Sequence, residues 1–293
     1  MKPYYTKLIS GLRKMGIRVE TAAHDRDSTL ATVDRMAGVH IVDHGNHRHP
    51  RLLNTGIAYI YPFWNLDPWG IRALSSIASI PFDADLVDPS AASDFTARLR
   101  KRLVDPRISR YPQPDAHLDL PKGHIVVFLQ SEAHRAVEET CHLNMRQMLS
   151  ALRARKDPRP ILVKPHPRDS ATATRSYLSR LADRDPRVQV VDANIHDMLA
   201  AASVAVTINS AVGIEAHLHR VPVVLCGQSD FHHAAVTVTD RRNMDAAIAS
   251  AETTEWPHDA YLYWYFAQQC LNAGKPSLVT DFLTKVAESL PHT

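Results

Sequence analysis

Two short polar stretches of this chain have the residue types and the spacing for binding a phosphate. The first is Lys164-Pro165-His166-Pro167-Arg168, in which a histidine stands between two prolines and two cations flank it. Proline restricts its own backbone and that of the residue before it, so the His166 ring is held in one place. Cationic donors around a fixed imidazole suit phosphate oxygens. A rigid turn whose charges face water is the alternative, and this stretch alone does not separate the two.

The second stretch runs from Asn209 through Ser210 and Gly213 to Glu215 and predicts the start of a helix at about Ala211. Free backbone N–H groups and the helix dipole favour an anion at such a start. Gly213 permits a ligand to approach the backbone closely, and the Glu215 carboxylate could accept hydrogen bonds from ribose hydroxyls. The alternative is an ordinary capped helix, with Asn209 or Ser210 as the N-cap and Glu215 completing the capping interaction.

Histidines also gather in the N-terminal part of the chain, at His44, His47 and His49. Their spacing could suit a metal ion, but no cysteine or carboxylate pattern completes a known site, so we predict no metal site. A basic loop that meets a sugar carboxylate and a solvated turn are the interpretations left open.

Asp67 stands among Phe63, Trp64 and Trp69 in the stretch PFWNLDPWG. An aromatic wall with one carboxylate is typical of a sugar site, where the carboxylate could serve as a base toward an acceptor hydroxyl. The alternative is a buried turn in which Asp67 caps the backbone before Pro68.

The elements that must position the two phosphate stretches alternate between strands and helices. Short runs rich in Val and Ile, at 161–163, 188–191, 204–208 and 221–225, predict strands that are buried on both faces. Helical patterns separate these runs, which favours a parallel, doubly wound sheet. Ligands bind at the carboxyl ends of such strands. The two phosphate stretches therefore predict a nucleotide–sugar site at one end of a sheet.

The proline-rich stretch Asp105–Leu120 has weak periodicity and predicts an interdomain linker. We expect an N-terminal, acceptor-side α/β domain over residues 1–115 and a C-terminal, nucleotide-sugar-binding α/β domain with closing helices over 116–293. Two Rossmann-like domains that face a cleft are the plan of the GT-B glycosyltransferases, so the fold class expected is α/β and GT-B-like.

Composition limits the partners of the chain. Of its 293 residues 45% are hydrophobic and 22% charged, which is typical of a globular protein, and the net charge of +3 comes without a dense basic tract. We therefore expect no nucleic-acid partner. Three widely spaced cysteines and the lack of a long apolar run predict a cytoplasmic protein, with peripheral contact to the inner membrane or to an assembly complex left open.

The stretches VKPHPR and TINSAVGIEAHLHRVPVVLCG together resemble the capsular polysaccharide biosynthesis family. That family includes retaining β-Kdo transferases with a GT-B fold and a CMP-Kdo donor. Two further stretches, AYIYPFWNLDPWGIRALSSIA and FLQSEAHRAV, are similar to the family's aromatic segment and to its strand-then-Gln motif. The resemblance covers roughly residues 57–230 and is strongest in the first two stretches.

The resemblance implies roles for particular residues. His166 and Pro167 would contact the CMP phosphate, Ser210 and the helix start would support it, and Glu215 would bind the ribose. The complete set of donor-binding residues expected is Gln130, Lys164, His166, Pro167, Arg168, Asn209, Ser210, Gly213 and Glu215.

The catalytic positions expected are Asp67, Glu132 and His134. Related sequences place an aspartate four residues after the glutamine, where this chain has His134. Glu132 lies close by but out of register. Asp67 or Glu132 is the candidate carboxylate near the reacting carbon.

The activity expected is transfer of a CMP-activated acidic sugar to a glycan or glycolipid acceptor, without a cofactor. Within enzymes, a sialyltransferase, a polyol-phosphate transferase and a nucleotide-sugar epimerase remain open. From another class, a non-catalytic nucleotide- or glycan-binding partner in a capsule assembly complex remains open, and the residue at position 134 supports it.

Overall fold

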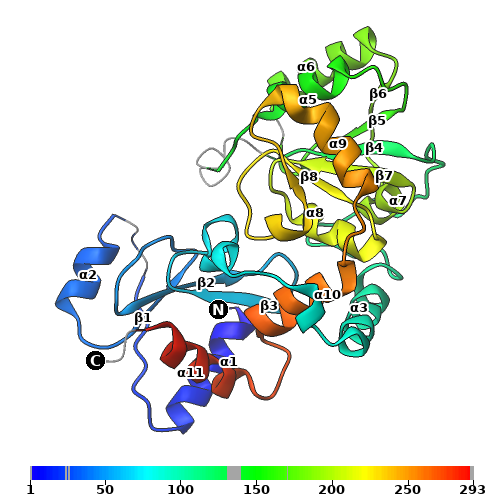
Figure 1. The fold of residues 1–293 in the computed structure, drawn as a ribbon. Coiled ribbons are helices and arrows are strands. Elements are labelled where there is room, and N and C mark those ends of the chain that lie inside the picture. Colours follow the sequence, from blue (N-terminus) through cyan, green and yellow to red (C-terminus); the bar gives the residue numbers. More distant parts are fainter. Residues whose placement is uncertain (1, 24, 26, 131–139, 170, 291–293) are drawn as a thin grey trace. The chain divides into compact units, whose positions relative to one another are not determined.

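The structure is a computed structural model of the chain and describes residues 2–23, 25, 27–130, 140–169 and 171–290. It divides into two compact units (Figure 1). Unit 1 comprises Met1–Pro81 and Trp264–Thr293, and unit 2 comprises Phe82–Tyr263. This division differs from the expected ranges 1–115 and 116–293, because the helix Pro89–Leu103 packs within unit 2 and the last helix packs within unit 1.

Unit 1 is built on a mixed four-stranded sheet in the order β1-β2-β3-β10. Only β1 and β2 pair in parallel, and the other two pairs are antiparallel. The strands are β1 (His40–Asp43), β2 (Leu52–Ile57), β3 (Phe63–Asp67) and β10 (Leu271–Asn272), and the helices are α1 (Pro3–Lys14), α2 (Thr29–Arg35) and α11 (Leu278–Ser289), with a π-helix at Trp264–Gln269.

The aromatic stretch that predicted a sugar-binding wall forms part of the core of unit 1. Phe63 and Trp64 lie in β3 and are only 2% and 1% exposed. The Trp64 ring stacks on Tyr4 of α1 with their ring centroids 4.0 Å apart, and α11 packs against the same cluster through Phe282. Burial of these rings explains their presence without a ligand.

Unit 2 is built on a parallel six-stranded sheet in the order β6-β5-β4-β7-β8-β9. The chain starts in the middle, fills one side and then returns to fill the other, which is the strand order of the dinucleotide-binding folds. The strands are β4 (His124–Phe128), β5 (Ile161–Lys164), β6 (Val188–Val190), β7 (Ala202–Thr207), β8 (Val223–Leu225) and β9 (Val236–Thr237).

Helices cover both faces of this sheet, as the buried side chains of alternate strand residues require. Val127 and Val206 join one core cluster with α5 and α9, whereas α7 and α8 contact β7 from elsewhere in unit 2. The helices of unit 2 are α3 (Pro89–Leu103), α5 (Met145–Ala154), α6 (Thr172–Arg184), α7 (Ile195–Ala200), α8 (Ala211–Ala216), α9 (Met244–Thr253) and α10 (His258–Tyr263).

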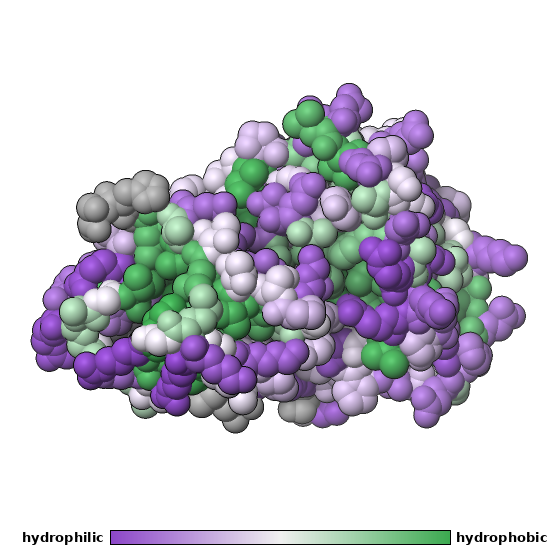
Figure 2. Space-filling view, turned by 90° about the horizontal axis from the view of Figure 1, so that it is seen from below, coloured by the Kyte–Doolittle hydropathy of each residue, from purple (hydrophilic) through white to green (hydrophobic). Residues whose placement is uncertain are grey.

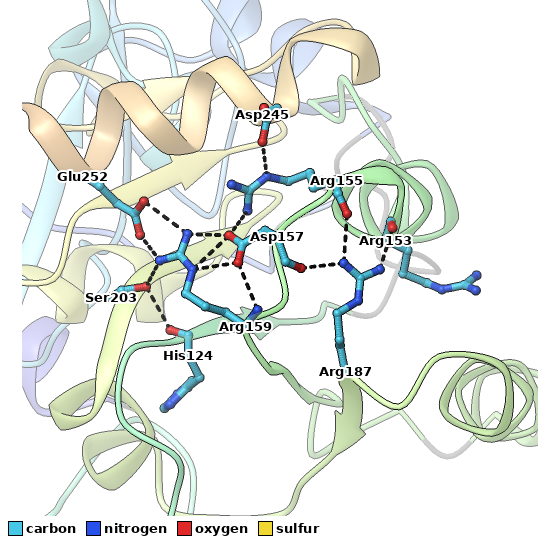
Figure 3. A network of polar contacts seen from close by, with 9 residues as sticks. All are labelled: His124, Arg153, Arg155, Asp157, Arg159, Arg187, Ser203, Asp245 and Glu252. Carbon is cyan, nitrogen blue, oxygen red and sulfur yellow. Dashed lines mark hydrogen bonds and ion pairs between the residues drawn. The ribbon is translucent and has the colours of Figure 1, made fainter.

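The amino ends of the strands in unit 2 are closed by a network of arginines and carboxylates (Figure 3). Arg159, just before β5, donates to Asp157 with Nε and Oδ2 2.9 Å apart, and it also pairs with Glu252 of α9. Arg155 is bonded to Asp245 at 2.6 Å and Arg187 to the Asp157 carbonyl oxygen at 2.6 Å. The hydrogen bonds from Arg159 lower the pKa of the Asp157 carboxyl to about 2.

Several histidines of unit 2 lie in its interior and not in polar loops. His217 and His258 face each other with their Nδ1 atoms 2.8 Å apart, and His196 and His219 pair at 2.9 Å. Burial lowers the pKa of His217, and it lowers that of His258 to about 4, so both rings are neutral near pH 7. His217 and His258 are therefore interior side chains of unit 2.

The face shown in Figure 2 is mostly hydrophilic, with apolar side chains gathered on the side where α1 and α11 lie in Figure 1. Within the described part of the chain, the helices are too short or too polar for any of them to cross a membrane.

Candidate functional site

The strand order of unit 2 puts a topological switch point at the carboxyl ends of β4 and β7. These two central strands are neighbours, and the next strand in the chain after each of them lies on opposite sides of the pair. Ligands of parallel α/β sheets bind at such a point. Gln130 follows β4, and Asn209 and Ser210 follow β7, so three residues predicted for the donor site lie at this point.

Gln130 and Asn209 bind each other at this switch point. The Gln130 amide Nε2 donates to Asn209 Oδ1 at 2.9 Å, and the Asn209 backbone N–H donates to Gln130 Oε1 at 2.8 Å. Asn209 Nδ2 also donates to Thr140 Oγ1 at 2.8 Å and to the Gln228 carbonyl oxygen at 2.9 Å. Because most of their bonding capacity is used in this way, the two side chains join the segments that follow β4 and β7.

Lys164 does not flank His166 in the manner the sequence suggested. It is the last residue of β5 and only 7% exposed. Its ammonium Nζ donates to Asp192 Oδ1 at 2.8 Å and to the Ala193 carbonyl oxygen at 2.7 Å. The ammonium thus ties the loop after β5 to the loop after β6, and its charge is already matched by a carboxylate.

His166 and Arg168 lie in the loop after β5, where His166 is partly exposed and Arg168 is exposed. The backbone N–H of Arg168 donates to His166 Nδ1 at 3.2 Å. Because Nδ1 accepts, the neutral ring carries its proton on Nε2, which can donate. Pro167 is exposed between them. The rigid turn and the phosphate site of the sequence argument are therefore compatible, since the turn fixes the tautomer.

The proline-rich stretch expected to link two domains is a part of unit 2. We define the strap as Arg107–Pro114. Arg107 Nε donates to Asp197 Oδ1 of α7 at 3.0 Å, and Asn194 Nδ2 donates to the Arg107 carbonyl oxygen at 3.1 Å. The backbone N–H of Ile195 donates to Gln113 Oε1 at 3.2 Å. The strap is thus fastened to the loop between β6 and α7 by partners more than 80 residues away in sequence.

The strap brings Tyr111 against the loop after β5. The Tyr111 and His166 rings meet edge to face with their centroids 5.2 Å apart, and Arg168 Cζ lies 4.9 Å from the centre of the Tyr111 ring. Arg110 Cζ lies 5.7 Å from the same ring. Sequence reasoning missed Arg110 and Tyr111, because they stand among prolines in a stretch without periodicity; an Arg-Tyr pair in such a stretch is the signal that could have drawn attention to them.

The helix start after β7 forms as expected. Ser210 is the N-cap of α8, and its hydroxyl accepts from the Val212 backbone N–H at 3.4 Å. Gly213 allows a close approach, but the neighbour is the Phe231 ring: a Cβ at Gly213 would lie 3.0 Å from Phe231 Cζ. In the structure, the small residue thus makes room for a side chain of unit 2.

Glu215 lies inside unit 2 and is only 3% exposed. The hydroxyl of Ser109, a residue of the strap, donates to Glu215 Oε1 at 3.0 Å. Burial raises the pKa of the Glu215 carboxyl to about 7, against the opposing effects of Ser109 and of the nearby Arg110 charge. The carboxyl group therefore changes its protonation state close to neutral pH. It accepts a hydrogen bond from the strap, through Ser109.

Comparison with known proteins bears on the family and the fold of the chain. The model of the family described as "Capsule polysaccharide biosynthesis protein" matches residues 97–273, which is more than half of the chain. The chain belongs to the capsule polysaccharide biosynthesis family. The family predicted from the sequence is thus confirmed, and the match begins before the strap and includes every residue of the carboxyl-end site.

Solved structures similar to this family member include two KpsC proteins of Thermosulfurimonas dismutans. The β-Kdo 2,7 transferase is 15% identical, with a TM-score of 0.55 over 89% of this chain and 86% of that one. The β-Kdo 2,4 transferase is 17% identical, with a TM-score of 0.47 over 72% and 70%. A UDP-GlcNAc 2-epimerase of Methanocaldococcus jannaschii is 10% identical, with a TM-score of 0.38 over 68% and 53%. No curated protein matches the sequence.

At these identities the similarity to solved structures concerns the fold alone. It confirms the predicted α/β, GT-B-like class, and the parallel sheet of unit 2 is its clearest expression. The sheet of unit 1 is mixed, so its likeness to a Rossmann fold is limited to the pair β1 and β2.

Asp67, the acceptor-side carboxylate expected in this family member, is fully engaged in unit 1. It is 3% exposed, and its oxygens accept from the backbone N–H groups of Trp69 at 2.8 Å and Gly70 at 3.1 Å. Ser76 donates to it with both its backbone N–H and its hydroxyl, at 2.9 and 2.7 Å. The geometry matches the capped turn that the sequence left open as the alternative.

The other two predicted catalytic residues, Glu132 and His134, lie outside the described residues and stay predictions. The loop histidines of unit 1 are bonded to neighbours: His49 Nε2 lies 3.1 Å from Asp34 Oδ1, and His44 Nδ1 lies 2.9 Å from Asp43 Oδ1. Among the described residues, no three His, Cys, Asp or Glu side chains are placed to hold a metal ion.

Proposed function

We propose that this protein is a glycosyltransferase of capsule or surface polysaccharide synthesis that uses a CMP-activated acidic sugar such as CMP-Kdo. The observation that carries the proposal is the meeting of Gln130 and Asn209 at the carboxyl ends of β4 and β7, with the loop of His166 after the neighbouring strand β5. Membership of the capsule polysaccharide biosynthesis family supports the pathway. The KpsC proteins, which share the fold, support the donor class.

The chemistry asks for stabilisation of a leaving phosphate. Transfer from a nucleotide–sugar passes through an oxocarbenium-like state in which the bond to the phosphate is breaking and negative charge grows on its oxygens. Preorganised donors lower the free energy of that state most when they are already aimed at the growing charge. In the proposed site His166 donates through Nε2 and Arg168 adds positive charge, without a metal ion. Lys164 acts indirectly, by fixing the loop that carries both.

The remaining donor residues have supporting tasks in this proposal. Gln130 and Asn209 join the segments that follow β4 and β7, and Ser210 presents the start of α8 to the nucleotide. Glu215 would reach a ribose hydroxyl beside or in place of its bond to Ser109. The acceptor is a glycan or glycolipid, and Glu132 is the carboxylate that we propose for activating its hydroxyl, because the oxygens of Asp67 are already bonded.

The proposal is tested by thermal denaturation with CMP, CDP, UMP and UDP, followed by transfer assays with CMP-Kdo. A ligand present at a hundredfold its dissociation constant adds about 2.7 kcal/mol to the free energy of unfolding, which is a visible shift. We expect CMP to stabilise the wild type and His166→Ala to lose that effect. His40→Ala in unit 1 is the matched control and should keep it.

A UDP preference would contradict the donor but keep the fold argument, and would direct attention to epimerase or other transferase chemistry. If no nucleotide changes the melting temperature, the transferase proposal fails.

A second function is favoured by His134, which stands where related sequences have an aspartate. A nucleotide- or glycan-binding partner in a capsule assembly complex would need the binding residues without the catalytic carboxylate. It predicts that CMP binds but that no CMP is released from CMP-Kdo in the presence of capsule acceptors. Turnover of CMP-Kdo would exclude this alternative.

A further inference from the structure

Two arginines and a histidine converge on one aromatic ring at the carboxyl end of the sheet in unit 2. Arg110 comes from the strap and Arg168 from the loop after β5, and their Cζ atoms lie 5.7 and 4.9 Å from the centre of the Tyr111 ring. His166 meets the edge of that ring. These four residues come from two segments more than 50 residues apart, so their meeting is a product of the fold and not of local sequence.

The positive charge of this cluster is not matched by acidic side chains. Among the described residues, neither Arg110 nor Arg168 forms an ion pair, whereas seven other arginines of unit 2 do. Glu215 interacts electrostatically with Arg110, but it is buried and bonded to Ser109. Two neighbouring guanidinium groups without a carboxylate repel each other, and a bound anion would remove that cost.

The strap is held firmly enough to make this arrangement a site. On one side of Tyr111, Arg107 is bonded to Asp197 and the Ile108 carbonyl oxygen lies 2.9 Å from His196 Nε2. On the other side, Gln113 accepts from the Ile195 backbone N–H. Because both flanks are fixed to the β6–α7 region, Arg110 and Tyr111 are placed before any ligand arrives, which lowers the entropy cost of binding.

A phosphate is the ligand that this geometry suits best. A guanidinium group lying over an aromatic ring keeps its N–H donors in its own plane, where they match two oxygens of a phosphate. The ring itself already carries both arginines, so it serves as their support. Lys164, the cation that the sequence placed in this clamp, is bonded to Asp192, and Arg110 supplies the second charge instead.

We infer that Arg110 and Arg168 form the phosphate subsite of the nucleotide site, with Tyr111 as the residue that positions both. This inference rests on the proposed function, because it takes the phosphate to be that of a bound nucleotide. It makes the strap, which precedes the first strand of the sheet, a wall of the donor site. Contacts to the phosphate and contacts to the nucleoside should then be separable, since only binding of the phosphate should depend on the two arginines.

The test compares each nucleotide with its nucleoside. Dissociation constants of CMP and cytidine, and in parallel of UMP and uridine, are measured by calorimetry or competition for the wild type, Arg110→Gln, Arg168→Gln and the double variant. Loss of one charged hydrogen bond to phosphate should weaken CMP about tenfold, and loss of both about a hundredfold. Cytidine binding should stay unchanged. Arg180→Gln, an exposed arginine on α6, is the control and should bind CMP as the wild type does.

The role of Tyr111 is tested with a matched pair of substitutions. Tyr111→Phe keeps the ring and should retain the wild-type ratio of CMP to cytidine affinity, whereas Tyr111→Leu should lower the CMP affinity several-fold and leave cytidine unaffected. A purely structural role would weaken nucleotide and nucleoside alike. That outcome would assign Tyr111 to folding.

The possible results separate the two proposals. If the wild type binds CMP but the arginine variants bind it equally well, the phosphate subsite is wrong and the proposed function stands. If the variants lose nucleoside and nucleotide equally, the subsite is also wrong, because the arginines then support the fold of the strap. If the wild type binds no nucleotide, both proposals fail.

Discussion

The two ends of the sheet in unit 2 use the same residue type for opposite purposes. At the amino ends, Arg159 is bonded to Asp157 and Glu252, and the network around it is closed by further carboxylates (Figure 3). At the carboxyl ends, Arg110 and Arg168 share an aromatic ring and lack a carboxylate partner within the described part of the chain. The same side chain contributes to stability in one place and is available to a ligand in the other.

The role of an arginine in this unit is therefore set by its partner and not by its position in a motif. A guanidinium held by a partly buried carboxylate is costly to disturb, because the remaining charge cannot return fully to water. A guanidinium without a carboxylate costs little stability when removed and leaves the charge of an incoming anion unmatched. Stability and affinity should therefore respond separately to substitutions at the two ends.

The largest effect should come from breaking the amino-end network at Asp157. Asp157→Asn leaves Arg159 and the mostly buried Arg155 without their shared carboxylate, and we expect the free energy of unfolding to fall by about 3 kcal/mol. Urea denaturation at pH 7 measures this loss. CMP affinity of the folded fraction should not change, since the network lies at the other end of the sheet.

Asp183→Asn, on the exposed side of α6, is the matched control and should change stability by less than about 0.5 kcal/mol. A loss at Asp157 no greater than that of the control would show that the network contributes nothing measurable.

A smaller, pH-dependent effect is expected at Glu215 on the carboxyl side. Its folded-state pKa, about 7, lies above the ordinary value of 4.5, so the folded protein keeps a proton that the unfolded chain releases. The stability of the wild type should therefore decline as pH rises from about 4.5 to about 7. Glu215→Gln keeps the shape of the side chain and the bond to Ser109 but cannot ionise. Its free energy of unfolding should therefore rise by about 2 kcal/mol relative to that of the wild type between pH 5 and pH 8.

Melting temperatures of the wild type and of Glu215→Gln, measured across this pH range without nucleotide, test this difference in stability. Parallel curves would mean that Glu215 ionises in the folded state as easily as in water.

The smallest effect tests the boundary between the two classes of arginine within the strap itself. Arg107 is paired with Asp197, and Arg107→Gln should lower the free energy of unfolding by about 1 to 2 kcal/mol. Arg110→Gln, three residues later, should leave it within about 0.5 kcal/mol. Chemical denaturation of the two variants side by side measures the difference. Equal losses would contradict the view that only the paired arginine stabilises the strap.

Much of unit 2 could be predicted from its sequence, because its signals are local. The apolar runs at 161–163, 188–191, 204–208 and 221–225 correspond to β5, β6, β7 and β8, and the Ser210 cap starts α8 as expected. The Val and Ile content that identifies such strands depends only on burial of both faces. The placement of the two phosphate stretches at one end of the sheet followed from the same pattern.

What could not be predicted depends on partners far away in sequence. Nothing near Lys164 shows that its ammonium meets Asp192, and nothing near Arg107 shows that Asp197 holds the strap. Prolines in the strap suppress periodicity, and the absence of periodicity looks the same in a linker and in a segment bonded to a folded unit. In unit 1, the aromatic stretch around Trp64 was ambiguous for a related reason, since a core strand and a sugar-binding wall share the same residues.

The place of the strap in the chain has a consequence for how such proteins exchange parts during evolution. The strap precedes β4, so the six strands of the sheet and the wall beside their carboxyl ends do not begin at the same residue. A recombination that joined a foreign N-terminal half at residue 116 would transmit the whole sheet and leave Arg107, Arg110 and Tyr111 with the other parent. Only a crossover upstream of the strap would transfer the sheet and the strap together to the recombinant protein.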